Sequence, residues 1–144
     1  MGDWGYKAYE NDEAADWFAR FWESKNFDPI ESTAANFDPG NENYDEIRAA
    51  AHVLACFGSP YACPSDFLDK LKPTIRKVVT ILENMIDPPD EAWDFLEIWE
   101  NSPEIIAEVK RQIAELKAYL GYLVGGGASF VYLSKFTVFL ESKI

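Results

Sequence analysis

The longest regular pattern in this chain is a run of large apolar residues near its carboxyl end, spaced three and four residues apart. The run consists of Ile106, Val109, Ile113, Leu116, Leu120 and Leu123. Residues at these spacings share one face of an α-helix, so the run predicts a long helix that packs this face against other helices. Ser102 and Pro103 come directly before it, and a serine cap followed by proline at the first helical position is a typical helix start.

Proline and glycine divide the middle of the chain into further helical segments. Asp28 and Pro29 predict a helix with Asp28 as its cap, and the Asp-Pro-Gly turn at residues 38–40 ends it after a few turns. The next helix is expected to begin at Asn43 and to end before Gly58.

Pro73 predicts a break in the segment that follows. Proline lacks an amide hydrogen and clashes with the carbonyl four residues earlier, so it is disfavoured inside a straight helix. We therefore expect a helical turn from Ser65, a short helix to about Leu71, and a new or kinked helix from Pro73. The apolar face of that last helix consists of Ile75, Val78, Val79, Leu82 and Ile86.

The amino-terminal stretch is aromatic and leads into the first helix. Asn11 is a good cap, and the acidic residues in the first turns suit the positive end of the helix dipole. The expected apolar stripe of this helix is Ala14, Trp17, Phe18, Phe21 and Trp22. The aromatic residues upstream that are expected to fold back over the helix start are Trp4, Tyr6 and Tyr9.

Together these segments predict an all-α fold, a single-domain bundle of about five to seven helices. The domain is expected to cover residues 1–124, and an apolar tail over residues 125–144 to pack on it or on a partner. The tail starts with three glycines, and its segment 130–140 is rich in β-forming residues, so both a terminal helix and a strand are expected forms. Residues 119–140 carry a single charge, Lys135, but the glycines and tyrosines make this stretch a poor membrane span.

Charge limits the classes of partner. The formal net charge is −12, and residues 87–104 hold seven acidic residues and no basic one. Such a surface repels nucleic acid and anionic membranes and attracts basic proteins. A helix over residues 90–104 is expected, with Trp93, Leu96 and Trp99 on its buried side. The predicted partner-binding residues are Asp90, Glu91, Asp94, Glu97, Glu100 and Glu104.

The chemistry-bearing residues do not assemble into a recognisable catalytic or metal motif. His52 and Cys56 are one helical turn apart, but a Cys-His pair needs a third group, and none is evident. A zinc site would need more ligands than these two residues and Cys63 supply. We therefore predict no catalytic residue, no metal site and no cofactor. One pair of cysteines without a recognisable secretory signal favours reduced thiols in a cytoplasmic protein.

The opening of the chain resembles a known bacterial family. The pattern is Trp4-Gly5, then Tyr9 with Asn11-Asp12, then Ala15-Asp16-Trp17. It is similar to the start of the family named domain of unknown function 4259, and the stretch 95–100 is a weaker echo of the same family. The resemblance implies a helical fold and transfers no activity, catalytic residue or cofactor.

Three functions are consistent with these observations. The first is a small acidic binding protein that docks a basic partner, such as an immunity protein that neutralises a basic bacterial toxin. The second is a self-associating protein, with a homodimer closed by the apolar tail. The third is an enzyme that uses carboxylates around Glu10, Asp12 and Asp16, with or without a divalent metal.

Overall fold

The computed structural model describes residues 2–59 and 61–122, and in these ranges the protein consists of helices joined by short turns. The helices are α1 (Asp12–Ser24), α2 (Asp28–Ala35), α3 (Tyr44–Phe57), α4 (Leu68–Ile86), α5 (Phe95–Ile98) and α6 (Pro103–Tyr122), with 3-10 turns η1 (Pro39–Asn41) and η2 (Ser65–Phe67). The predicted all-α class is confirmed. The tail over residues 125–144, expected as helix or strand, lies outside the described residues.

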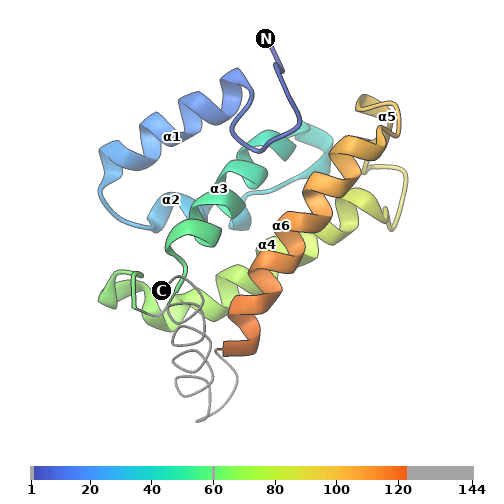
Figure 1. Cartoon of the computed structure of the whole chain (residues 1–144). Coiled ribbons are helices and arrows are strands. Elements are labelled where there is room, and N and C mark those ends of the chain that lie inside the picture. The colour runs from blue at the N-terminus through green and yellow to red at the C-terminus, as the bar shows by residue number, and fades with distance from the viewer. Residues whose placement is uncertain (1, 60, 123–144) are drawn as a thin grey trace, which may run out of the picture.

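The central helix is α3, which contacts α1, α2, α4 and α6 (Figure 1). Its residues 47–51 are all buried, including three consecutive alanines. A helix that is buried on every side must be surrounded by other elements, and small side chains let those elements approach closely. The long helices α4 and α6 pack against each other beside α3, and α1 and α2 lie on its other side.

The helix starts follow the sequence signals in most places. Asn11 caps α1 by accepting a 2.7 Å hydrogen bond from the amide of Ala14. Pro103 is the first residue of α6, as predicted. At α2 the prediction was wrong by one residue, because Phe27 is the cap and Asp28 already belongs to the first turn. There Asp28 favours the helix through its charge near the positive dipole end, without a capping hydrogen bond.

The break predicted at Pro73 does not occur. The helix α4 runs from Leu68 to Ile86 with Pro73 inside it. Proline removes one backbone donor, and the carbonyl that loses its partner belongs to Asp69, which is exposed and can be solvated. The buried stripe of α4, from Leu71 through Ile75 onward, outweighs that local cost.

Two apolar stripes differ from the prediction. In α1, Ala14, Trp17 and Phe21 are buried as expected, but Phe18 is half-buried and Trp22 is 60% exposed. In α6 the buried face consists of Ile105, Val109, Gln112, Ile113 and Leu116, while Ile106 is half-buried. Both buried faces are shifted slightly from the predicted ones, because α1 and α6 each pack against more than one neighbouring helix. Within residues 2–59 and 61–122, no helix has an apolar stretch long enough to cross a membrane.

Candidate functional site

The acidic segment 87–104 forms one helical turn and then enters α6 at Pro103, so the single helix predicted over residues 90–104 was wrong. The turn is α5, which begins after Asp94. It ends where the amide of Asn101 donates a 2.8 Å hydrogen bond to the carbonyl of Leu96 and where Glu100 and Asn101 have φ values of 52° and 55°. Backbone in this left-handed conformation stops a helix. Fully buried Phe95 anchors the turn in the core.

Most of the predicted partner-binding residues lie on the surface. The exposed members are Asp90, Glu91, Glu97, Glu100 and Glu104. Asp94 is the exception, because it is half-buried and accepts a 2.9 Å hydrogen bond from the hydroxyl of Tyr44. That hydroxyl in turn accepts from the amide of Asp94 at 3.1 Å. Asp94 therefore holds the segment to α3 and is unsuited to direct contact with a partner.

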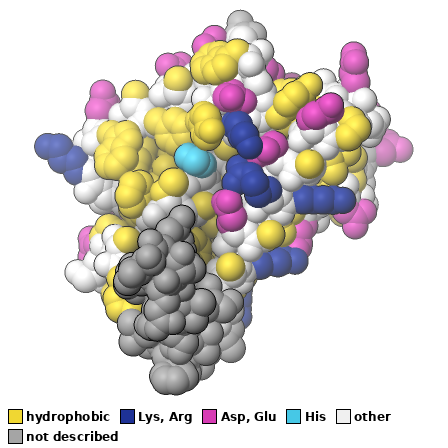
Figure 2. Space-filling view, viewed as in Figure 1, with side chains coloured by type: hydrophobic (Ala, Val, Ile, Leu, Met, Phe, Trp, Pro, Cys, Tyr) yellow, Lys and Arg dark blue, Asp and Glu magenta, His cyan; other side chains and the backbone are white. Residues whose placement is uncertain are grey.

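The carboxylates of this segment have no basic counterpart in the described part of the chain. Ion pairs there involve other acids, namely Glu31, Glu46, Glu83, Glu108 and Glu115. None of the acids between residues 87 and 104 belongs to this set. A hydrogen bond from Ser102 lowers the pKa of Glu104, which keeps it ionised. In Figure 2 acidic side chains are visible at the end of the molecule where Figure 1 places α5.

Apolar and aromatic side chains lie beside these acidic residues. Ile98 is 50% exposed and stands next to Glu97. The ring of Tyr6 packs on the half-buried ring of Trp99, with centroids 5.9 Å apart. The sequence pattern did not mark Ile98 as a surface residue of interest, and Tyr6 was expected to lie over the start of α1. A helical projection of the segment would have placed Ile98 opposite the buried stripe, but the position of Tyr6 depends on tertiary contacts.

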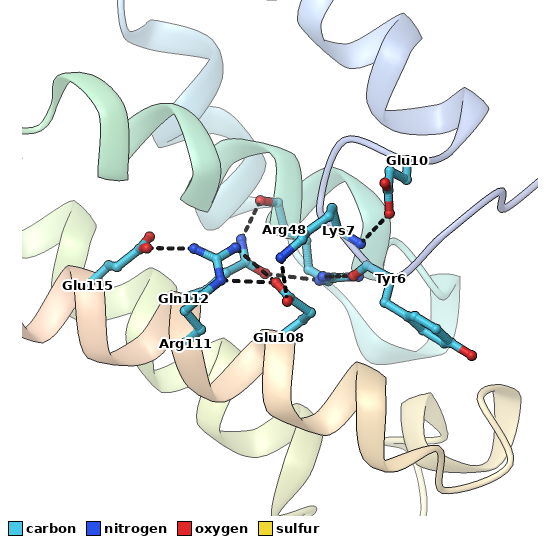
Figure 3. Close-up of polar contacts among 8 residues, drawn as sticks. All are labelled: Tyr6, Lys7, Glu10, Arg48, Glu108, Arg111, Gln112 and Glu115. Atoms are coloured by element: carbon cyan, nitrogen blue, oxygen red, sulfur yellow. Dashed lines mark hydrogen bonds and ion pairs between the residues drawn. The ribbon is translucent and has the colours of Figure 1, made fainter.

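The arm that carries Tyr6 is held by a buried arginine, shown in Figure 3. Arg48 of α3 is 1% exposed and donates to the carbonyl of Tyr6 at 2.7 Å and to Oε1 of Gln112 at 3.0 Å. Gln112 returns a 3.0 Å bond to the carbonyl of Arg48. Burial lowers the pKa of Arg48 to about 10, so it stays protonated at neutral pH. Beside it, Lys7 of the arm pairs with Glu108 of α6 at 2.6 Å.

This network fixes the arm between α3 and α6 rather than against α1 alone. The arm also forms a 2.9 Å backbone hydrogen bond from Trp4 to the carbonyl of Glu10. Folding back over the helix start is thus confirmed for the backbone, while the rings of Tyr6 and Tyr9 lie elsewhere, on Trp99 and on His52. No sequence signal identifies Arg48 as a core residue, because arginine is normally exposed.

The amino-terminal acids have individual structural partners. Glu10 accepts a hydrogen bond from the amide of Lys7, and Asp12 accepts one from the amide of Gly2. Asp16 is exposed and borders a shallow polar hollow. Within residues 2–59 and 61–122, no three His, Cys, Asp or Glu side chains converge as metal ligands would. The carboxylate enzyme therefore stays a hypothesis without an observation in its favour.

One carboxylate in this region is strongly perturbed. Burial, then the nearby charges of Asp3 and Glu13, raise the pKa of Asp45 to about 6. These residues line a small hollow of about 100 Å³ together with Asn11 and Asp12. A raised pKa accompanies many catalytic acids, but crowded structural carboxylates show it as well.

The His52–Cys56 pair lies in a hollow on the α1–α3 face. The sulfur of Cys56 and Nε2 of His52 are 3.8 Å apart. Burial lowers the pKa of His52 and raises the pKa of Cys56. Both shifts favour neutral groups, whereas a nucleophilic cysteine needs a stabilised thiolate. Both Cys56 and Cys63 are free thiols.

Comparisons with known proteins give one match. Residues 2–112 match the model of the family described as domain of unknown function, DUF4259. No curated protein and no solved structure matches the chain.

Proposed function

The chain belongs to the DUF4259 family, and we propose that this member is a small acidic binding protein that docks a basic protein partner on segment 87–104. Within this proposal, the protein would be of the immunity type: it would bind a basic bacterial toxin and neutralise it. The docking surface would consist of the exposed carboxylates of the segment around Ile98, with the ring of Tyr6 at its edge.

The observation that carries the proposal is the set of carboxylates without an ion-pair partner in the described chain. Some acids elsewhere in the described chain are paired, as when Arg111 of α6 bridges Glu108 and Glu115, whereas none in segment 87–104 is. An unbalanced cluster raises the local negative potential and speeds the approach of a positively charged partner. Folding gains nothing from keeping so many like charges close together, so a role in binding gives the cluster a physical reason.

Exposed charges alone give speed and specificity rather than affinity. Tight interfaces need a buried apolar or aromatic anchor surrounded by a polar rim. Ile98 and the Tyr6–Trp99 pair supply such an anchor beside the acids. The Arg48 network holds Tyr6 in place before binding, which lowers the ordering cost of the complex.

The test compares two variants with equal charge change. The docking variant carries Asp90→Asn, Glu91→Gln, Glu97→Gln and Glu100→Gln. The control variant carries Asp16→Asn, Glu23→Gln, Asp66→Asn and Asp69→Asn, all of which are exposed acids outside the segment. Basic proteins encoded beside its gene would be purified and titrated calorimetrically against the native chain and both variants, at low and high salt.

The expected result is salt-sensitive binding that is at least about tenfold weaker for the docking variant than for the control variant. An Ile98→Ser variant should weaken the same complex even at high salt, because its contribution is apolar. Equal weakening by both charge variants would mean that net charge alone attracts the protein and that segment 87–104 is not the docking surface. The absence of any salt-sensitive partner would end the proposal.

A further inference from the structure

The hollow that contains His52 and Cys56 is lined mainly by aromatic rings, and we call it the aromatic hollow. Its volume is about 240 Å³, and its lining includes Tyr9, Phe18, Trp22, His52, Cys56 and Phe57. Figure 2 shows hydrophobic side chains gathered around the histidine on this face. The amino-terminal arm, α1 and α3 each contribute at least one of these rings, so the hollow exists only in the folded chain.

The rings of the aromatic hollow hold one another in place but keep large areas open to solvent. Trp22 meets Phe57 edge-to-face, with centroids 6.1 Å apart, and the centroid of Tyr9 is 5.1 Å from that of His52. Yet Trp22 is 60% exposed, Tyr9 45% and Phe57 40%. Exposed apolar surface of this kind often marks a binding site, and rings that are already positioned lower the ordering cost of binding.

The lining of the aromatic hollow carries no positive charge at neutral pH. No Lys or Arg borders it, and burial, followed by the charge of Arg111, lowers the pKa of His52, so the imidazole is neutral. Arg111 itself is paired with both Glu108 and Glu115. At Cys56, burial and then the negative charge of Glu115 raise the pKa of the thiol. A cation entering the hollow therefore meets neutral rings and a nearby carboxylate.

Charge complementarity favours one kind of occupant. Residues 2–122 hold 24 acidic and 11 basic side chains, and such an excess raises the concentration of small cations near the surface. No carboxylate lines the aromatic hollow, so a metal ion or a primary ammonium would lose its strong hydration there without replacement. A quaternary ammonium group is weakly hydrated, because methyl groups surround its charge, and aromatic rings attract it. The open side of the hollow leaves the rest of such a molecule in water.

We propose that the aromatic hollow binds a small quaternary ammonium compound of the choline class, with the methyl groups of the cation against the rings of Tyr9, Trp22 and Phe57. Indole attracts cations more strongly than the other aromatic rings do, so Trp22 contributes most to the preference for a charged ligand. No residue of segment 87–104 lines the hollow, so this site is separate from the proposed docking surface for a basic protein.

The test uses the full-length chain and the histidine as its reporter. His52 is the one histidine of the sequence, so its ring-proton signals in NMR spectra identify binding in the hollow without further assignment. Choline would be titrated at neutral pH and constant ionic strength, in parallel with its neutral analogue, in which a carbon atom replaces the nitrogen. The two ligands have nearly the same shape, and the comparison therefore isolates the effect of the positive charge.

We expect choline to shift the His52 signals along a saturable curve, with a Kd at least about fivefold lower than that of the neutral analogue. Trp22→Leu keeps the hollow apolar but removes the indole, so it should weaken choline at least about fivefold and the neutral analogue much less. The matched control is Trp4→Leu, which removes another 60% exposed ring that does not line the hollow, and it should leave both affinities unchanged.

A second pair of variants tests the charge from the side of the protein. Cys56 is exposed, so Cys56→Lys places a cation beside the hollow, and it should remove the preference for choline that Cys56→Met retains. Three results would overturn the proposal: no saturable shift with choline, equal affinity for choline and its neutral analogue, or equal weakening of choline by Trp22→Leu and Trp4→Leu. None of them depends on whether segment 87–104 binds a basic protein.

Discussion

The buried Arg48–Gln112 pair gives the sharpest test of how this fold is held together. The proposed perturbation is Gln112→Leu, which conserves volume but removes the acceptor of the arginine's Nε–H. Both side chains are nearly inaccessible, with 1% exposure for Arg48 and 2% for Gln112. Water therefore has little access to replace the lost partner.

The magnitude follows from the burial of a charge. Leaving a donor of a buried, charged group without its acceptor costs more than the loss of an ordinary hydrogen bond, and breaking buried charged contacts typically costs several kcal/mol. Arg48 keeps its bond to the carbonyl of Tyr6, so we expect a loss of about 3 kcal/mol. That is a large part of the total stability of a typical domain.

The assay is urea unfolding followed by tryptophan fluorescence, with Lys110→Leu as the control at an exposed position of α6. The control should change stability by less than about 0.5 kcal/mol. In the double variant Arg48→Met/Gln112→Leu the buried charge is absent, so the double variant should be no less stable than Gln112→Leu alone. A loss below about 1 kcal/mol for Gln112→Leu, or strictly additive losses in the double variant, would refute this account.

Three further outcomes are expected. Gly58→Ala should destabilise by about 1–3 kcal/mol, because its Cβ would collide with a backbone carbonyl one turn earlier in α3, whereas Gly121→Ala, with open space around it, should be neutral or stabilising in thermal unfolding. Tyr44→Phe should lower the free energy of unfolding by about 1–2 kcal/mol and speed amide hydrogen exchange from Asp94 onward, because the hydroxyl of Tyr44 both donates to and accepts from Asp94. Unchanged exchange would show that this pair of hydrogen bonds does not hold the segment to α3. Since burial raises the pKa of Asp45 to about 6, the folded state binds its proton more tightly than the unfolded state, so this group lowers stability as pH rises from about 4 to about 6. Asp45→Asn should remove that fall, as measured by urea midpoints at both ends of the window, and an identical pH profile in the variant would argue against it.

The helix boundaries were largely readable from local signals. Asn11 and Pro103 mark helix starts because capping and the fixed φ of proline act on adjacent residues only. Gly58 closes α3 as predicted, although its φ of −80° lies in the ordinary region. The glycine is needed there for space rather than for backbone freedom.

The candidate site was readable only in part. The acidic composition of segment 87–104 is a property of the sequence, and most of its predicted binding residues are exposed. Its apolar spacing suggested a long helix, but the burial of Phe95 and the left-handed residues Glu100 and Asn101 reduce it to one turn. Tyr44 bonds to Asp94 across 50 positions of sequence, a contact that no local pattern announces.

By itself, the sequence determined the helical class, most helix ends and the negative charge of the surface, because each depends on residues a few positions apart or on a simple sum of charges. Only the tertiary structure decided that Arg48 lies in the core, that α4 continues through Pro73, and that Trp22 faces outward. These outcomes balance a local cost against contacts from distant segments. A buried arginine is tolerated when α6 and the amino-terminal arm bring acceptors to it, and that coincidence exists only once the chain is folded.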